Sequence, residues 1–114
     1  MDDKITLRID SILKHIDEVL EDTKEATLLD YKNSRLLLKS TCFSICQIGE
    51  QMTKIEEIMK NKYPELPWKS ARGMRNFIIH DYNSVDVEQI YTTVKNDLPI
   101  LRTMFERIKK EISI

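Results

Sequence analysis

Apolar residues recur at steps of three and four along most of this chain, and residues that break helices are scarce. Only 2 glycines and 3 prolines occur among the 114 residues, so a few long helices are favoured over many short strands. Apolar residues make up 41% of the sequence, which at this length fills one core but not two. We therefore expect a single all-α domain over residues 1–114, arranged as an up-and-down bundle of four or five helices.

The apolar stripes place the first two helices. A first helix is expected over residues 3–22, and a second from about Leu28 to Lys62. A straight helix of that second length would span ~50 Å, which is long for a chain of this size. Either Gly49 bends it, or it extends into an oligomer interface. Gly49 would also permit the backbone of another helix to come close.

Two prolines, Pro64 and Pro67, mark the end of the long helix and the start of a third, which is expected from about Pro67 to His80. The side of this third helix that is expected to pack against the domain consists of Met74, Phe77 and Ile78.

A fourth helix is expected to begin near Val85, with Ser84 or Asp86 as its N-cap. Pro99 interrupts the apolar pattern that follows. We therefore expect Asp97 to cap a last helix, which carries the remaining apolar stripe of the chain.

The overall charge excludes some functions and restricts others. The formal net charge is -1 and the pI is about 6.1, so any nucleic-acid-binding surface must be a local patch. No apolar run exceeds three residues, whereas a membrane span needs roughly 20. The N-terminus lacks the basic and hydrophobic regions of a signal peptide. A cytoplasmic location is therefore the expected one.

The two cysteines, Cys42 and Cys46, lie four positions apart on the predicted long helix. This spacing fits either a metal or redox pair or two small core residues. Two thiols are too few ligands for a structural zinc ion. Burial in the core is therefore the favoured interpretation.

From residue 66 to residue 80 the chain has no acidic side chain, although 32% of all residues are charged. The cations of this segment are Lys69, Arg72 and Arg75. Because helical residues advance by about 100° each, Arg72, Asn76 and His80 fall within roughly 80° and form one polar stripe. The stripe suits phosphate binding, with Arg72 and Asn76 as supporting residues. Side chains near a helix end also serve merely as caps and surface charge.

Arg75 and His80 are five positions apart, which corresponds to about 140° of helical rotation. On a regular helix their side chains would not converge on one atom. Either the helix unwinds near His80, or two copies of the chain face each other so that Arg75 of one subunit lies beside His80 of the other. The second alternative makes a symmetric dimer part of the site.

These residue types suit the cleavage of a phosphodiester. An imidazole takes or gives a proton near neutral pH, and a guanidinium stabilises the extra negative charge of the transition state. No carboxylate cluster accompanies His80, so neither a metal nor another cofactor is expected. Without a metal, RNA is the favoured substrate, because its 2′-hydroxyl is an internal nucleophile.

The segment from Arg75 to Tyr82 reads Arg-Asn-Phe-Ile-Ile-His-Asp-Tyr. It resembles the Arg-x4-His-x-Tyr motif of HepT-like proteins, which are small helical ribonucleases of the HEPN superfamily. The combination with its surroundings is far more specific than Arg-x4-His alone. The surrounding pieces that match in the same order, over roughly residues 5–108, are Ile48-Gly49-Glu50, Pro67-Trp68, Gly73-Met74-Arg75-Asn76, Val85-Asp86 and Leu98-Pro99.

The resemblance implies a toxin of a prokaryotic toxin–antitoxin pair that acts as a homodimer and cleaves RNA without a metal. By the motif, Arg75 and His80 are the catalytic pair and Asn76 assists them. Glu50 resembles a polar residue that faces the same cleft. Tyr82 matches the tyrosine to which a partner nucleotidyltransferase of the MNT type attaches AMP, and the negative charge added there would repel an RNA phosphate.

Two other interpretations stay open. The first is a non-catalytic HEPN module that binds nucleotide, RNA or a nucleotidyltransferase partner, and the low pI of about 6.1 favours it slightly. The second is a purely structural helical adaptor. Cleavage of RNA by the isolated protein distinguishes both of them from a nuclease.

Overall fold

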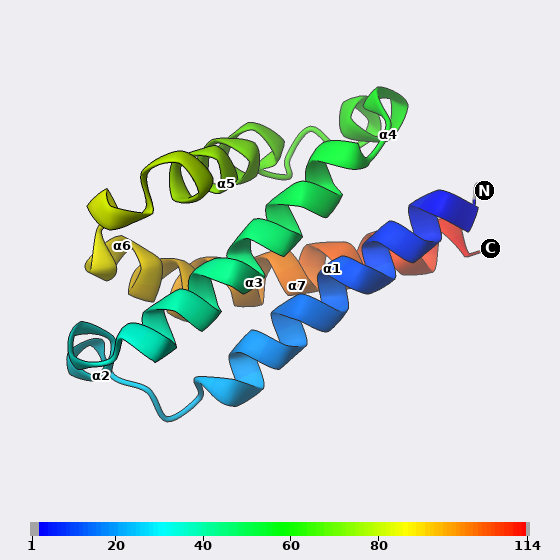
Figure 1. Cartoon of the computed structure of the whole chain (residues 1–114). Helices are drawn as coiled ribbons and strands as arrows, with labels where there is room; N and C mark the ends of the chain where they lie inside the picture. Colours follow the sequence, from blue (N-terminus) through cyan, green and yellow to red (C-terminus); the bar gives the residue numbers. More distant parts are fainter. Residues whose placement is uncertain (1–2, 114) are drawn as a thin grey trace.

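The computed structural model describes residues 3–113, and this part of the chain contains helices and no strand (Figure 1). The fold therefore confirms the expected all-α, HEPN-like bundle. Three short helices alternate with the long ones. The long helices are α1 (Asp3–Asp22), α3 (Arg35–Lys54), α5 (Trp68–Asp81) and α7 (Leu98–Ile112). The short ones are α2 (Leu28–Asn33), α4 (Glu57–Lys62) and α6 (Val87–Thr92).

Helix α3 lies at the centre of the arrangement. It packs against α1 on one side and α5 on the other, and α1 also packs against α7. The N-terminal end of α1 and the C-terminal end of α7 lie close together at one end of the molecule (Figure 1). Helix α5 is thus an outer helix that packs mainly against α3 and exposes one of its sides to solvent.

The prediction of one helix from Leu28 to Lys62 is wrong, because that segment forms the three helices α2, α3 and α4. Ser34 has an extended backbone (φ -126°, ψ 106°) and its hydroxyl accepts a hydrogen bond from the Leu37 N–H at 3.1 Å, so it ends α2 and caps α3. Ile55 (ψ 138°) and Glu56 (ψ 148°) are also extended. The bend at Ile55 places this side chain in the core, where it is 4% exposed.

Helix α3 continues without interruption through Gly49 to Lys54. The role of Gly49 is the other one expected, the close approach of a second backbone. A Cβ atom at Gly49 would lie 2.9 Å from the carbonyl oxygen of Ala71 and 3.0 Å from the Cβ of Arg75. The absence of a side chain at this point lets α5 come into backbone contact with α3.

Helices α6 and α7 are joined without a break in helical backbone. Asp86 caps α6 as expected, accepting hydrogen bonds from the N–H groups of the following turn. The expected cap at Asp97 is wrong, because Asp97 is itself helical (φ -81°, ψ -42°) and its side chain makes no capping bond. A π-helical turn, Thr93–Asp97, shifts the hydrogen-bonding register. Pro99, which lacks an N–H, is therefore accommodated in the first turn of α7.

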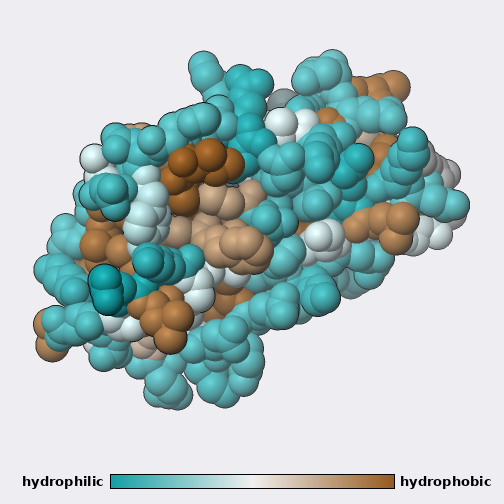
Figure 2. All heavy atoms as spheres, viewed as in Figure 1, coloured by the Kyte–Doolittle hydropathy of each residue, from teal (hydrophilic) through white to brown (hydrophobic). Residues whose placement is uncertain are grey.

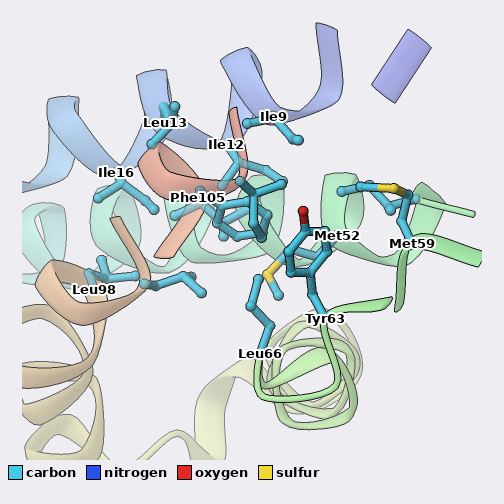
Figure 3. Packing of buried hydrophobic residues seen from close by; sticks show 14 of the residues in the cluster. Ile9, Ile12, Leu13, Ile16, Met52, Met59, Tyr63, Leu66, Leu98 and Phe105 are labelled. Atoms are coloured by element: carbon cyan, nitrogen blue, oxygen red, sulfur yellow. The ribbon is translucent and has the colours of Figure 1, made fainter. Parts of the chain in front are cut away.

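Two hydrophobic clusters hold the helices together. In the larger one, side chains of α1 and α3 gather around Phe105 of α7 (Figure 3). Trp68 at the start of α5 packs edge-on against Phe105, with ring centroids 6.1 Å apart. The indole N–H of Trp68 donates to the Tyr63 carbonyl at 2.9 Å. These contacts fix where α5 begins.

The smaller cluster lies beneath the other end of α5. It consists of Tyr31, Cys42, Ile45, Ile78 and Ile90, with Cys46, Met74 and Tyr82 packed against it. Cys42 is buried and Cys46 is half-buried, and neither forms a disulfide. Their expected packing in the core is confirmed. Within residues 3–113, no helix is both long and apolar enough to cross a membrane.

Candidate active site

Helix α5 presents the polar stripe expected from its sequence. Arg72, Asn76 and His80 are all exposed. On the opposite side Ile78 is buried, with 6% of its surface accessible, and Met74 packs against the smaller cluster. The expectation for Phe77 is wrong, because this residue is 47% exposed.

Three of the residues expected in the site meet around one guanidinium group. Arg75 donates to the Asn76 side-chain oxygen from Nε at 3.1 Å and from Nη2 at 2.7 Å. Its Nη1 donates to Oε2 of Glu50 on α3. The side chain of Arg75 is 19% exposed and that of Glu50 is 34% exposed. The guanidinium is therefore fixed in direction while one side of the cluster remains open to solvent.

The charge of Glu50 is balanced from two directions. The hydrogen bond from Arg75 lowers the pKa of the Glu50 carboxyl, and Lys54 contributes to the same shift. Lys54 Nζ lies 3.4 Å from Oε1 of Glu50. The carboxylate is therefore ionised at neutral pH. Our sequence interpretation missed Lys54, although its position one turn after Glu50 is the usual spacing for a helical ion pair.

The two cysteines near Arg75 are at least partly buried. Burial raises the pKa of the Cys46 thiol, while the positive charge of Arg75 acts against that rise. Burial, followed by the charge of Cys46, raises the pKa of Cys42 to about 11. In the described part of the chain, no group of three or more histidine, cysteine or acidic side chains could hold a metal ion.

His80 lies on the exposed face one turn beyond Asn76, and its side chain has no hydrogen bond or ion pair with residues 3–113. The helix does not unwind before it. The backbone leaves the helical region only at Asp81 (φ -148°, ψ 45°), where a short 3-10 turn, Tyr82–Ser84, follows. His80 and Arg75 therefore keep the rotation of a regular helix between them, and unwinding does not bring the two side chains together within one subunit.

Tyr82 begins this turn and is half-buried against the smaller cluster. Burial, followed by the nearby Cys42, raises the pKa of its hydroxyl. The phenol is consequently protonated at neutral pH. Its ring is anchored in the domain only two residues after His80, so a group attached to its oxygen would lie near the end of the polar stripe.

An all-α bundle that carries Arg-x4-His-x-Tyr at the end of an exposed helix defines a ribonuclease-type protein of the HEPN class. The family described as ribonuclease HepT-like matches residues 9–108. The chain belongs to this family. The match covers every helix from α2 to α6 and most of α1 and α7, so the whole polar stripe lies inside it.

Individual relatives agree with the family. A protein of Methanocaldococcus jannaschii, named as an inferred RNase, is 32% identical over 101 residues, which cover 89% of this chain and 84% of that protein. A protein of Thermococcus cleftensis, named as an inferred ribonuclease HepT, is 34% identical over 106 residues, covering 90% of this chain and 93% of that protein. No solved structure gave a significant match.

Proposed function

We propose that this protein is a metal-independent ribonuclease and the toxin of a prokaryotic toxin–antitoxin pair. Membership of the ribonuclease HepT-like family supports cleavage of RNA. One observation carries the assignment of the site: the guanidinium of Arg75 is fixed between Glu50 and Asn76, on the helix that also exposes His80. A fixed cation and an unengaged imidazole on the same helix are suited to reaction at a phosphate once a second copy of the helix brings them together.

In the proposed reaction, the 2′-hydroxyl of the RNA attacks the neighbouring phosphorus. His80 takes the proton of that hydroxyl, and Arg75 stabilises the extra negative charge of the five-coordinate phosphorus. The bond from phosphorus to the 5′-oxygen then breaks, leaving a 2′,3′-cyclic phosphate and a 5′-hydroxyl. The leaving oxygen takes up a proton from the solvent, so that each site needs one Arg75 and one His80.

A symmetric dimer is part of this proposal. The rotation of about 140° between Arg75 and His80 prevents them from meeting on one helix. A second subunit removes the difficulty if two α5 helices face each other. Exposed apolar side chains on α3 and α5 support such a contact, and Figure 2 shows apolar atoms between these helices. The side chains concerned are Leu36 at 79%, Phe43 at 62% and Ile79 at 58% exposed.

Tyr82 is the proposed control point. An MNT-type nucleotidyltransferase antitoxin would attach AMP to its hydroxyl, adding bulk and a negative charge two residues after His80. A substrate phosphate would then meet like charge at the entrance to the site. The anchored position of the Tyr82 ring in the smaller cluster supports this role, because it limits where the added group can go.

Cleavage of RNA by the purified protein in EDTA tests the assignment. Wild type should cut, and His80→Ala should lose activity by at least about 10²-fold, as expected for loss of a general base. The chain has one other histidine, His15 on α1, which lies 3.9 Å from Glu18 and far along the chain from α5. His15→Ala is therefore a matched control and should cut like wild type. Equal cleavage by wild type and His80→Ala would contradict the catalytic role, and RNA binding without cleavage by any variant would favour the non-catalytic module.

A further inference from the structure

A hollow in the surface lies at the beginning of α5, away from the cluster of Arg75, Glu50 and Asn76. It has a volume of about 440 Å³ and is bounded by the end of α3, by α4 and by the first turn of α5. Half-buried Trp68 forms part of its wall, and its indole N–H is already bonded to Tyr63. The polar side chains that line it include Lys60, Asn61, Lys69 and Arg72.

The charge of this hollow is strongly one-sided. Three cationic side chains line it, whereas Glu57 is the one acidic side chain among the described residues of its lining. Lys60 is held in place, since its Nζ donates to the Thr53 carbonyl at 3.1 Å and lies 3.6 Å from Glu57. Lys69 and Arg72, by contrast, are exposed and form no ion pair within residues 3–113. Figure 2 shows mainly hydrophilic atoms around the junction of α4 and α5. In a protein of net charge -1, such a concentration of unpaired positive charge favours an anionic ligand.

The hollow is continuous with the proposed catalytic stripe. Arg72 lines it and also belongs to the exposed face of α5 that carries Asn76 and His80. With a rise of 1.5 Å per residue, Lys69 and His80 are about 16 Å apart along the helix axis. A stacked nucleic-acid strand rises about 3.4 Å per nucleotide. A strand cut at His80 would therefore reach the hollow within several nucleotides.

We propose that the hollow between α4 and α5 is a phosphate subsite for the RNA strand, in which Lys69 and Arg72 each contact a backbone phosphate several nucleotides from the bond that is cut. The inference rests on the proposed function, because the strand must pass His80. Lys69 and Arg72 supply the charge, and Lys60 and Asn61 complete the wall. Phosphate contacts of this kind position a strand without reading its sequence.

Binding of single-stranded RNA of two lengths tests the proposal. In the His80→Ala background, which is not expected to cut, wild-type residues at the hollow should make a 12-nucleotide RNA bind tighter than a 3-nucleotide RNA. The double variant K69Q/R72Q should lose most of that gain, with about tenfold weaker binding of the longer RNA. The slope of log K against log salt should fall by about 1.4, since each lost phosphate contact on a single strand removes ~0.7.

The double variant K14Q/K110Q is the matched control. Lys14 on α1 and Lys110 on α7 are exposed, form no ion pair within the described residues and lie outside the hollow. K14Q/K110Q removes the same two positive charges as K69Q/R72Q. It should keep both the tighter binding of the longer RNA and the salt slope of the wild-type hollow. If K69Q/R72Q binds long RNA like the control, the subsite is refuted. If circular dichroism shows that K69Q/R72Q does not fold, the single variant K69Q replaces it. K69Q should show half of the expected change in the slope of log K against log salt.

Two further results separate the subsite from neighbouring explanations. If K69Q/R72Q weakens binding of free ATP while RNA length has no effect on affinity, the hollow is a nucleotide site and the RNA subsite is refuted. If wild type fails to cleave RNA but the length-dependent gain is lost only in K69Q/R72Q, the catalytic proposal fails while the subsite stands. If wild type cleaves RNA and K69Q/R72Q binds RNA as tightly as wild type does, the catalytic proposal stands and the subsite is refuted.

Discussion

Gly49 of α3 lies directly against Ala71 of α5, so closely that a Cβ atom at Gly49 would be 2.9 Å from the Ala71 carbonyl oxygen. This backbone contact determines the geometry of the site. Glu50 follows Gly49 on α3, and Arg75 lies one turn after Ala71 on α5. The ion pair between Glu50 and Arg75 therefore depends on how close the two helices come.

Gly49→Ala should destabilise the protein by about 1–3 kcal/mol, since the added methyl must push α5 away. Gly73 offers the matched control, because it also lies inside a helix but a Cβ there would meet nothing within 4 Å. Gly73→Ala should stabilise by roughly 0.5–1 kcal/mol through helix propensity. Urea unfolding measures both. Stabilisation by Gly49→Ala, like that expected for Gly73→Ala, would show that the contact with Ala71 is not tight.

Glu50→Gln should remove a pH-dependent part of the stability. Arg75, and then Lys54, hold the pKa of the Glu50 carboxyl below its usual 4.5 in the folded protein. A depressed folded pKa gives stability that is present above the unfolded pKa and is lost as the pH falls through the folded value. The stability difference between wild type and Glu50→Gln should therefore be largest at neutral pH and should shrink below about pH 4.

Urea unfolding at a series of pH values checks this expectation. Glu25→Gln is a suitable control, because Glu25 is exposed between α1 and α2 and forms no ion pair within residues 3–113. Its difference from wild type should be small at every pH. A difference for Glu50→Gln that stays constant down to acidic pH would contradict the coupling to Arg75.

The proposed dimer makes a prediction about mixed subunits. If a site combines Arg75 of one subunit with His80 of the other, then Arg75→Ala and His80→Ala proteins should each be inactive as homodimers. A mixed dimer should contain one intact site and one site lacking both residues. Unfolding the two proteins together and refolding them should restore up to about a quarter of wild-type activity, since random pairing makes half of the dimers mixed. No restoration, with dimers present by light scattering, would place both residues in one subunit's site.

The thiols should react slowly in the folded protein. Burial raises the pKa of Cys42 to about 11 and raises that of Cys46 in the same direction. At pH 8 a thiol of pKa 11 is thiolate in only ~0.1% of molecules, against ~10% for an ordinary cysteine, so Cys42 should react about 100-fold more slowly with a disulfide reagent. Denatured protein is the internal control and should react rapidly at both positions. Fast reaction of two thiols in the folded state would contradict their burial.

Local signals determined how far the fold could be predicted. Helix α1 agrees with the expected residues 3–22, because its apolar stripe is regular over the whole length of the helix. The stripe between Leu28 and Lys62 is equally regular across Ser34 and Ile55, and it therefore hid two breaks. Those breaks depend on a side-chain cap at Ser34 and on burial of Ile55 against other helices. Neither is visible in the spacing of apolar residues.

The site divides in the same way. The spacing on α5 placed Arg72, Asn76 and His80 on one exposed face, because helical periodicity alone decides that. The exposure of Phe77 could not be predicted, since it depends on which edge of α5 remains uncovered in the bundle. The pairing of Lys54 with Glu50 was available from their spacing of four, but only the meeting of α3 and α5 relates it to Arg75.

Tyr82→Phe should separate control of the protein from its activity. The Tyr82 hydroxyl makes no hydrogen bond within residues 3–113, while its ring packs on the smaller cluster. Loss of the oxygen should therefore change stability by less than about 0.5 kcal/mol. With an MNT-type nucleotidyltransferase and ATP, wild type should gain the mass of AMP and lose RNA cleavage, whereas Tyr82→Phe should gain nothing and keep cutting. Tyr91→Phe is the control, since Tyr91 is also half-buried and packs on Tyr31, and it should behave like wild type. Modification of Tyr82→Phe, or inhibition of it by the nucleotidyltransferase and ATP, would show that another residue carries the control.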